Sequence, residues 1–187
     1  LEESGVPVLA VETILEAMEP PGEEAFFRTD THWTEDGAQR AAQAVALAAQ
    51  ASGWSPEPVQ EYDAVREAPA VRPGDLVRLA GIEGLPARWQ PAPETARSAR
   101  FTPRSAAEED DLFGDAKLPR TVLIGTSFSR TSGFAGYLAQ ALHTPVAHFG
   151  RDGGNFSGGA AAYFQAPDWR ETPPRLVIWE IPERTLQ

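Results

Sequence analysis

The sequence predicts an α/β fold, a three-layer sandwich with a mainly parallel sheet. Four short apolar segments resemble strands, at residues 6–11, 121–124, 144–149 and 175–180. Helical or long connections separate these segments, an order that is typical of parallel sheets. The segment at 121–124 lacks polar alternation, as expected for a strand that is buried on both faces. These observations place residues 121–124 at the centre of the sheet.

The clearest predicted helix follows Thr34. This residue resembles an N-cap, and Glu35 and Asp36 would lie in the first turn, where negative charge suits the helix dipole. The alanine-rich segment 38–51 continues the helix until Ser and Gly at 52–53 end it. Apolar residues at helical spacing predict another helix over 133–142, and shorter helices are expected at 13–18, 74–79 and 160–164.

Residues 54–119, here called the excursion, differ from the rest of the chain. They hold nine of the seventeen prolines and show little sustained periodicity. Trp54, Trp89 and Phe101 would be costly to leave exposed, so we expect an ordered insertion rather than a linker. With 187 residues, the chain is long enough for one domain with a sizeable core. We therefore predict a single domain over 1–187 that contains the excursion and that is truncated at its N-terminus, because Leu1 begins abruptly.

Composition excludes several classes of function. The chain has no cysteine, which removes disulfides, thiolate nucleophiles and cysteine metal sites, and we expect no metal and no cofactor. The net charge of -11 makes nucleic acid an unsuitable partner, because phosphate binding needs clustered Lys and Arg. No apolar run is long enough to span a membrane. The glycine-rich loop at 150–159 lacks the ending of a P-loop.

Ser127 occupies a suggestive position. It follows the buried strand after Gly125 and Thr126 and precedes a helix. A strand, a tight turn and a helix together expose a serine hydroxyl at the carboxyl edge of a sheet, beside backbone N–H groups. An ordinary strand-to-helix connection capped by Ser and Thr explains the same stretch, so the turn needs a base before it indicates catalysis.

Asp30 and His32 supply that base. Residues two apart in an extended segment point to the same side, so Asp30 can accept the Nδ1 proton of His32 and leave Nε2 free. A serine hydroxyl is a poor nucleophile until a base removes its proton. His143 and His148 lie in apolar settings, where packing or surface roles are expected. An Asp-x-His pair that merely organises a turn is the alternative.

Three blocks together resemble a known family. They are Thr-Asp-Thr-His-Trp-Thr at 29–34 with Gly-Ala at 37–38, Gly-Thr-Ser-Phe-Ser at 125–129, and Trp-Glu-Ile-Pro-Glu-Arg at 179–184. In this order they resemble the alginate O-acetyltransferase family related to AlgX and AlgJ. The resemblance implies an SGNH-hydrolase-like fold in which the Asp-x-His pair precedes the nucleophile, a permuted motif order.

The resemblance implies that Ser127 is the nucleophile, His32 the general base and Asp30 its orienter. An acetyl group would pass through an acetyl-serine to a hydroxyl of a bacterial exopolysaccharide, either alginate-like or cellulose-like. A carbohydrate acetylesterase with the same mechanism and a non-catalytic polysaccharide-binding subunit of an export complex are the alternatives. The implied partners are the polysaccharide acceptor, an acetyl donor, a membrane-bound acetyl-transfer protein and other export proteins, in the periplasm or another extracytoplasmic compartment.

Other residues are candidates for substrate contact. Arg151 and Asn155 in the glycine-rich loop are candidate oxyanion donors, and Trp33, Phe128 and Tyr137 are candidate stacking faces for sugar. A local basic patch would offset the acidic charge of the chain, and the arginines beside the motifs are Arg28, Arg130, Arg151 and Arg184. We predict a groove beside Ser127, walled by the excursion and the loop at 150–159, with Trp33 and at least one of Arg130 and Arg151 in its lining.

Overall fold

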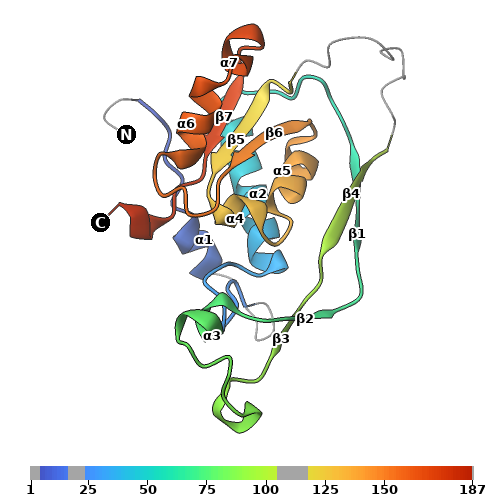
Figure 1. Cartoon of the computed structure of the whole chain (residues 1–187). Helices are drawn as coiled ribbons and strands as arrows, with labels where there is room; N and C mark the ends of the chain where they lie inside the picture. The colour runs from blue at the N-terminus through green and yellow to red at the C-terminus, as the bar shows by residue number, and fades with distance from the viewer. Residues whose placement is uncertain (1–4, 17–23, 105–117, 187) are drawn as a thin grey trace.

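A three-stranded parallel sheet forms the centre of the computed structural model, which describes residues 5–16, 24–104 and 118–186. The strand order is β6-β5-β7, with β5 at Thr121–Gly125, β6 at Val146–Gly150 and β7 at Leu176–Trp179. Ile124 of β5 lies opposite Phe149 of β6 and Trp179 of β7. The three strands therefore end at the same edge of the sheet (Figure 1).

The residues of β5 are buried along its whole length and divide between two cores. Val122 and Ile124 pack with helix α6 (Gly158–Gln165) on one face. Leu123 packs on the opposite face, in a core formed with α2 (Glu35–Ala51) and α5 (Phe134–Leu142). Helices thus cover both faces of a parallel sheet, and the predicted three-layer α/β fold is confirmed.

Helix α2 begins as the sequence predicts. The Thr34 hydroxyl accepts the Gly37 N–H at 3.1 Å, and Ser52 ends the helix. The buried alanines of α2 allow it to lie close to α5, in the same core as Leu123. The helix predicted over 133–142 is α5, and the helix predicted at 160–164 lies within α6.

The strand predicted at 6–11 is wrong. Residues 6–10 pair with no strand of the described chain, and Val6, Val8 and Leu9 are exposed. Helix α1 begins at Val11 and runs to Glu16, so it takes part of the helix predicted at 13–18, whose last two residues lie outside the described ranges. An apolar run alone indicates a strand only where a sheet edge is available to pair with it.

The excursion forms two antiparallel ribbons, described up to residue 104. Strand β1 (Tyr62–Arg66) pairs with β4 (Ala99–Pro103), and β2 (Ala70–Arg72) pairs with β3 (Glu94–Ala96). Between the ribbon strands lie α3 (Asp75–Leu79), where a helix was predicted at 74–79, and the 3-10 turn η2 (Ala87–Trp89). The described part of the excursion forms these helices and strands, but Trp89 is 66% exposed, contrary to expectation. Trp54 and Phe101 are partly buried against the core.

Phe101 attaches the β1–β4 ribbon to the body of the protein. Its ring meets the edge of Tyr137 on α5 at a centroid separation of 4.9 Å. A Cβ atom on Gly136 would lie 2.1 Å from the Phe101 ring, so only glycine leaves room for this contact. Figure 1 shows the ribbon passing beside α5 and continuing to β2, β3 and α3 below it.

Three short elements complete the fold: α4 (Ser127–Arg130), α7 (Asp168–Glu171) and the 3-10 turn η3 (Glu183–Thr185). Helix α4 follows β5 directly and lies at the carboxyl edge of the sheet. Over residues 5–16, 24–104 and 118–186, no helix is long and apolar enough to cross a membrane.

Candidate active site

Ser127 is the first residue of α4, immediately beyond the central strand. Gly125 ends β5, and Thr126 caps α4 by accepting the Phe128 N–H at 3.3 Å. A Cβ atom on Gly125 would lie 2.5 Å from the Ser129 Oγ, so the turn needs glycine there. The predicted strand, turn and helix are thus present, with Ser127 at the carboxyl end of the strand.

Glu180, the residue that follows β7, binds this turn through its carboxylate. Its carboxylate accepts the Thr126 N–H at 2.7 Å and the Thr126 hydroxyl at 2.9 Å. Burial raises the pKa of Glu180, and it outweighs the opposing effects of the Thr126 and Ser129 hydrogen bonds and of the Arg184 charge. Sequence reasoning placed Glu180 only within the closing block. An acidic residue at the carboxyl end of an apolar strand was the available signal for this role.

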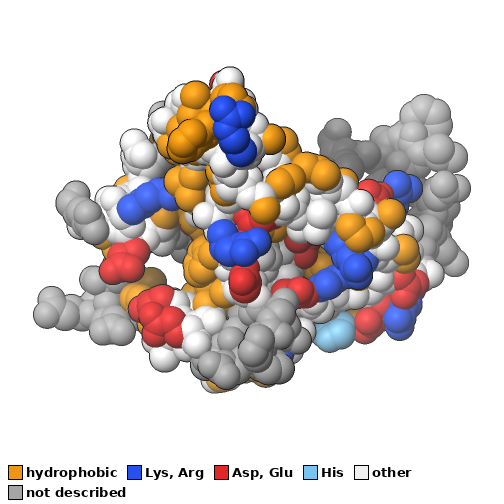
Figure 2. Space-filling model, turned by 90° about the horizontal axis from the view of Figure 1, so that it is seen from below, with side chains coloured by type: hydrophobic (Ala, Val, Ile, Leu, Met, Phe, Trp, Pro, Cys, Tyr) orange, Lys and Arg blue, Asp and Glu red, His pale blue; other side chains and the backbone are white. Residues whose placement is uncertain are grey.

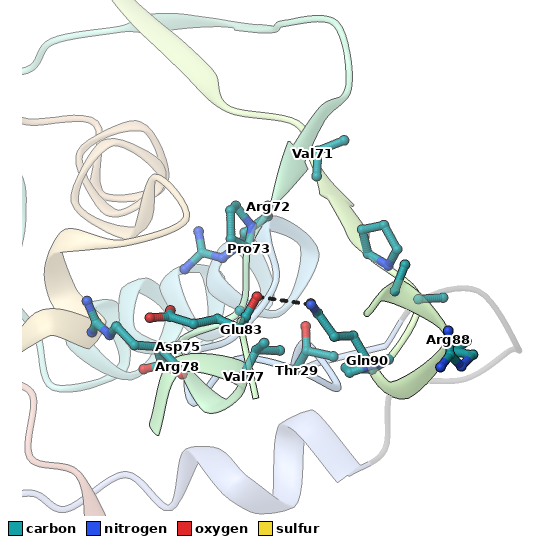
Figure 3. Close-up of a pocket in the computed structure, with 15 residues that line it drawn as sticks. Thr29, Val71, Arg72, Pro73, Asp75, Val77, Arg78, Glu83, Arg88 and Gln90 are labelled. Carbon is teal, nitrogen blue, oxygen red and sulfur yellow. Dashed lines mark hydrogen bonds between the residues drawn. The ribbon is translucent and has the colours of Figure 1, made fainter. Parts of the chain in front are cut away.

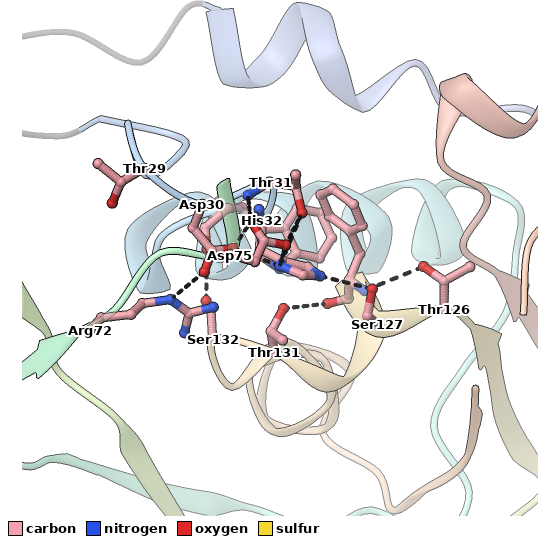
Figure 4. A network of polar contacts seen from close by, with 12 residues as sticks. Thr29, Asp30, Thr31, His32, Arg72, Asp75, Thr126, Ser127, Thr131 and Ser132 are labelled. Carbon is pink, nitrogen blue, oxygen red and sulfur yellow. Dashed lines mark hydrogen bonds and ion pairs between the residues drawn. The ribbon is translucent and has the colours of Figure 1, made fainter. Parts of the chain in front are cut away.

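His32 links Ser127 to Asp30. Its Nε2 lies 2.8 Å from the Ser127 Oγ, and its Nδ1 lies 2.7 Å from Asp30 Oδ1 (Figure 4). The same Asp30 oxygen accepts the backbone N–H of His32 at 2.9 Å. This geometry suits the tautomer in which Nδ1 carries the proton and Nε2 accepts from the serine hydroxyl. The structure therefore brings together the three residues that the sequence paired.

The Asp30 carboxylate is buried and bonded on both oxygens. Its side chain is 5% exposed, and Arg72 donates from Nε to Oδ2 at 3.1 Å. Burial raises the pKa of Asp30, but the hydrogen bonds from Arg72 and His32 outweigh this effect and hold the pKa below its ordinary value. Asp30 is consequently ionised at neutral pH.

A second carboxylate, that of Asp75 on α3, lies near the same ring. Asp75 accepts the Thr31 N–H at 2.7 Å and the Thr31 hydroxyl at 2.6 Å, and its Oδ2 is 3.8 Å from His32 Nδ1. Ligand atoms of Asp30, His32 and Asp75 lie within 4.8 Å of one another. Thr31, Arg72 and the His32 ring already bond to these carboxylates, so we describe the cluster as a hydrogen-bonded network and assign no metal to it.

Glu94 of β3 fixes the chain just before Asp30. Its carboxylate accepts the Arg28 N–H at 2.9 Å, the Thr29 N–H at 2.7 Å and the Thr29 hydroxyl at 2.5 Å. Burial raises the pKa of Glu94, but these hydrogen bonds and the Arg28 charge bring it below its ordinary value. Arg72, Asp75 and Glu94 were missed at the sequence level, because their partners lie 42 to 66 residues away along the chain.

The prediction that Trp33 and Tyr137 stack on sugar is wrong. Trp33 is 6% exposed and packs against Phe134 at 4.7 Å, and Tyr137 is 3% exposed beneath Phe101. Phe128 is only partly buried, and its ring lies 4.9 Å from the His32 ring. The Arg184 guanidinium stands over the Phe128 ring at 5.2 Å. Aromatic residues flanking a motif are as suited to the core as to a ligand, and burial distinguishes the two.

The four arginines of the predicted basic patch have different environments. Arg28 pairs with Glu24 and Glu94, and Arg130 lies 3.7 Å from Asp152, so nearby acids offset both charges. On the face seen in Figure 2, side chains of both signs are interspersed. The region is therefore not uniformly basic.

Arg151 and Asn155 are exposed on the loop after β6, where Arg151 donates its backbone N–H to Gly125 O at 3.0 Å. Among the described residues, neither side chain has a hydrogen bond to Ser127. Their role as oxyanion donors stays a prediction.

An open cavity of about 880 Å³ lies beside this network (Figure 3). Excursion residues from β2, α3 and the segment before β3 line it, and Thr29 is the contribution of the loop that carries Asp30. Ser127, Arg130 and Arg151 do not line this cavity. This hollow, walled by the excursion, is therefore not the groove predicted beside Ser127, which stays a prediction. Its predicted lining is wrong with respect to Trp33, which is buried in the core.

Comparison with known proteins identifies relatives of the chain. A family model described as "SGNH hydrolase-like domain, acetyltransferase AlgX" matches residues 1–183. The probable alginate O-acetylase AlgJ of Azotobacter vinelandii is 36% identical over 169 residues, which cover 88% of this chain and 43% of that protein. The chain thus spans less than half the length of this relative.

Two solved structures have the same fold. The O-acetyltransferase domain of Pseudomonas putida AlgJ matches with a TM-score of 0.83 and 29% identity, over 99% of this chain and 62% of that one. Pseudomonas aeruginosa AlgX matches with a TM-score of 0.68 and 27% identity, over 87% of this chain and 38% of that one. The chain therefore belongs to the family of SGNH hydrolase-like domains of the acetyltransferase AlgX, to which its three sequence blocks had pointed.

Proposed function

We propose that this chain transfers acetyl groups to alginate, with Ser127 as nucleophile, His32 as general base and Asp30 as the group that orients His32. One observation carries the proposal: Nε2 of His32 lies 2.8 Å from the Ser127 Oγ while its Nδ1 lies 2.7 Å from Asp30. A serine held in this way has a base for its proton and a carboxylate to stabilise the resulting imidazolium.

The reaction proceeds in two transfers. His32 Nε2 takes the Ser127 proton as Oγ attacks the acetyl carbonyl carbon of the donor, and His32 returns that proton to the leaving group. An acetyl-serine remains. An acceptor hydroxyl then gives its proton to His32 and attacks the acetyl-serine, whose collapse releases the acetylated sugar and restores the Ser127 hydroxyl with the proton from His32. Ser127 opens α4, where N–H groups have no partner within the helix, so its N–H suits the oxyanion.

The names of the relatives support alginate as the acceptor. A probable alginate O-acetylase is among them. The net charge of -11 opposes an anionic polymer, so its approach needs local cations. Arg184, above Phe128, is the candidate, although Glu180 lies close enough to feel its charge; Arg28 and Arg130 lie beside acidic side chains. We further propose that the chain works outside the cytoplasm with other proteins of alginate biosynthesis, which supply the acetyl donor.

The test is the capture of the acetyl-serine. The protein is mixed with an activated acetyl ester and followed by intact mass, and we expect a transient acetyl adduct that Ser127→Ala lacks. Ester turnover should fall by about 1000-fold or more in Ser127→Ala, with little change in melting temperature. Ser157→Ala is the matched control, because Ser157 is an exposed serine on the loop after β6. An adduct that persists in Ser127→Ala would exclude Ser127 as the nucleophile.

Transfer is then separated from hydrolysis. Alginate fragments and neutral glucan fragments are supplied with the donor, and acetylated sugar is measured by mass spectrometry. Acetylated alginate is the expected product. Free acetate with every acceptor would make the protein an esterase, which uses the same three residues.

A further inference from the structure

Two carboxylates lie within reach of the same nitrogen of His32. Asp30 Oδ1 is 2.7 Å from Nδ1, and Asp75 Oδ2 is 3.8 Å from it. Both side chains are at least partly buried, so each would attract the Nδ1 proton. A general base needs one fixed ring orientation, because a small misplacement of its Nε2 weakens proton transfer. A further contact must therefore favour Asp30 over Asp75 as the hydrogen-bond partner of Nδ1.

The two carboxylates differ in their contact with Arg72, which bonds to Asp30. It donates from Nε to Asp30 Oδ2 at 3.1 Å, on the oxygen that His32 does not use. Its guanidinium also lies 4.7 Å from the centre of the Phe27 ring, which limits its movement. Asp75 instead receives two hydrogen bonds from Thr31, and its Oδ2 lies 3.8 Å from Nδ1. Figure 4 shows Arg72 reaching Asp30 from the side opposite His32.

From these contacts we infer that Arg72 is a positioning residue, which the excursion brings to Asp30 so that Asp30, and not Asp75, orients His32. The inference rests on the proposed function of the Asp30–His32–Ser127 set. It assigns to the excursion a task in the reaction itself, because Arg72 is the last residue of β2 and is fixed there by pairing with Glu94.

Few charged groups of the described residues face Asp30. His32 approaches from the same loop, Arg72 from β2, and Asp75 lies on α3, farther from the His32 ring. Arg72 offsets the two negative charges. Without it, the Asp30 carboxylate would remain buried with one oxygen unpaired, a costly state that is relieved by binding a proton. A protonated Asp30 no longer stabilises the imidazolium of His32.

The experiment compares Arg72→Met with wild type in turnover of an activated acetyl ester as a function of pH. Methionine keeps the aliphatic length and removes the charge and the donor. We expect kcat to fall by about 10- to 100-fold with little change in KM. We also expect the acid limb of the profile to move to higher pH, because loss of the Arg72 charge favours protonation of the coupled Asp30–His32 pair and activity needs the unprotonated pair. Arg72→Lys, which keeps the charge, should return the limb towards its wild-type position and recover part of the rate.

Arg100→Met is the matched control. Arg100 is an arginine of the same excursion, paired with Glu67 at 3.2 Å, but on the exposed part of β4. Its variant should keep the wild-type rate and acid limb. Should Arg72→Met lose its cooperative thermal transition, Arg72→Gln is measured in the same way.

An acid limb that does not move in folded Arg72→Met or Arg72→Gln overturns the inference, as does a limb that stays displaced in Arg72→Lys. The proposed function is judged separately, by wild-type turnover and its loss in Ser127→Ala.

Discussion

The sheet core and the excursion are built on different principles. The core is held by burial: Leu123 and Ile124 are fully inaccessible to solvent, and helices cover them on both faces. The excursion has two narrow ribbons with exposed apolar side chains such as Val65 and Val71. Its contacts with the rest of the protein include those of Phe101, Arg72, Asp75 and Glu94.

The core and the excursion therefore have different effects: the core supplies the stability of the fold, and the excursion positions the loop that carries Asp30 and His32. Burial of apolar area supplies most of the free energy of folding, so the core determines whether the protein folds. Polar contacts of the excursion contribute less, but those of Glu94, Asp75 and Arg72 fix atoms of the loop that carries Asp30 and His32. We therefore expect substitutions in the core to alter stability first, and substitutions at the excursion contacts to alter activity first.

The largest expected effect is on stability, at Leu123. Leu123→Ala should lower the free energy of unfolding by about 2–5 kcal/mol, because it leaves a cavity between β5 and the α2–α5 core. Val65→Ala on the ribbon, where the side chain is 63% exposed, should change it by less than about 0.5 kcal/mol. Denaturant unfolding measures both. Equal losses would mean that the ribbon is part of the core.

Within the excursion, Gly→Ala substitutions at Gly74 and Gly84 should differ most clearly in their effects. A Cβ on Gly74 would lie 1.7 Å from the Thr29 carbonyl oxygen, whereas one on Gly84 would meet nothing within 4 Å. Gly74→Ala should therefore displace the loop and cost about 1–3 kcal/mol, with a larger proportional loss of ester turnover. Gly84→Ala should be close to neutral in both. Wild-type turnover in Gly74→Ala would contradict the idea that the excursion fixes the loop.

The contribution of Glu94 to the free energy of unfolding should depend on pH. Its pKa is lowered in the folded state, so the stability it contributes is present above the unfolded value of 4.5 and is lost as the pH falls below it. Glu94→Gln should lower the free energy of unfolding at neutral pH by about 1–3 kcal/mol. The gap between variant and wild type should narrow on acidification. Melting curves at neutral and acidic pH test this, and a gap that widens in acid would disprove it.

The smallest effect is expected at an exposed contact. Arg66 pairs with Asp36 at 2.6 Å, and both side chains are more than a third exposed. Arg66→Met should change the free energy of unfolding by less than about 0.5 kcal/mol, and added salt should remove the difference. A large effect that is insensitive to salt would show that the aliphatic part of Arg66 packs against α2.

Local signals in the sequence were sufficient for the core. The Val-Leu-Ile run of β5 and the cap at Thr34 depend on near neighbours in the chain, so they can be predicted from the sequence. The pairing of Asp30 with His32 is likewise local, since the two residues stand two apart. Their approach to Ser127, 95 residues away, was inferred from the need of a serine for a base and from the resemblance, not from any periodic pattern.

Contacts between distant segments were not predictable in this way. The ribbon pairs Tyr62 with Pro103, and neither strand has the alternation that would reveal it. The loop at 28–32 gives no sign that Arg72 and Glu94 bind it. Trp33 was misplaced for a related reason: its position beside His32 is clear from the sequence, but the direction in which it points depends on the packing of α5.

The contact of Phe101 with Gly136 has a consequence for how this family varies. Phe101 lies on β4, and β4 follows β3, which carries Glu94, after only two residues. A larger residue at Gly136 would push Phe101 outward, and we expect the shift to reach Glu94 through the short connection between β4 and β3. Relatives with a bulkier residue at the place of Gly136 should therefore carry a smaller one at the place of Phe101. A helix position far from the reacting atoms would thus covary with the ribbon, and substitution at both places together would be tolerated where either alone is not.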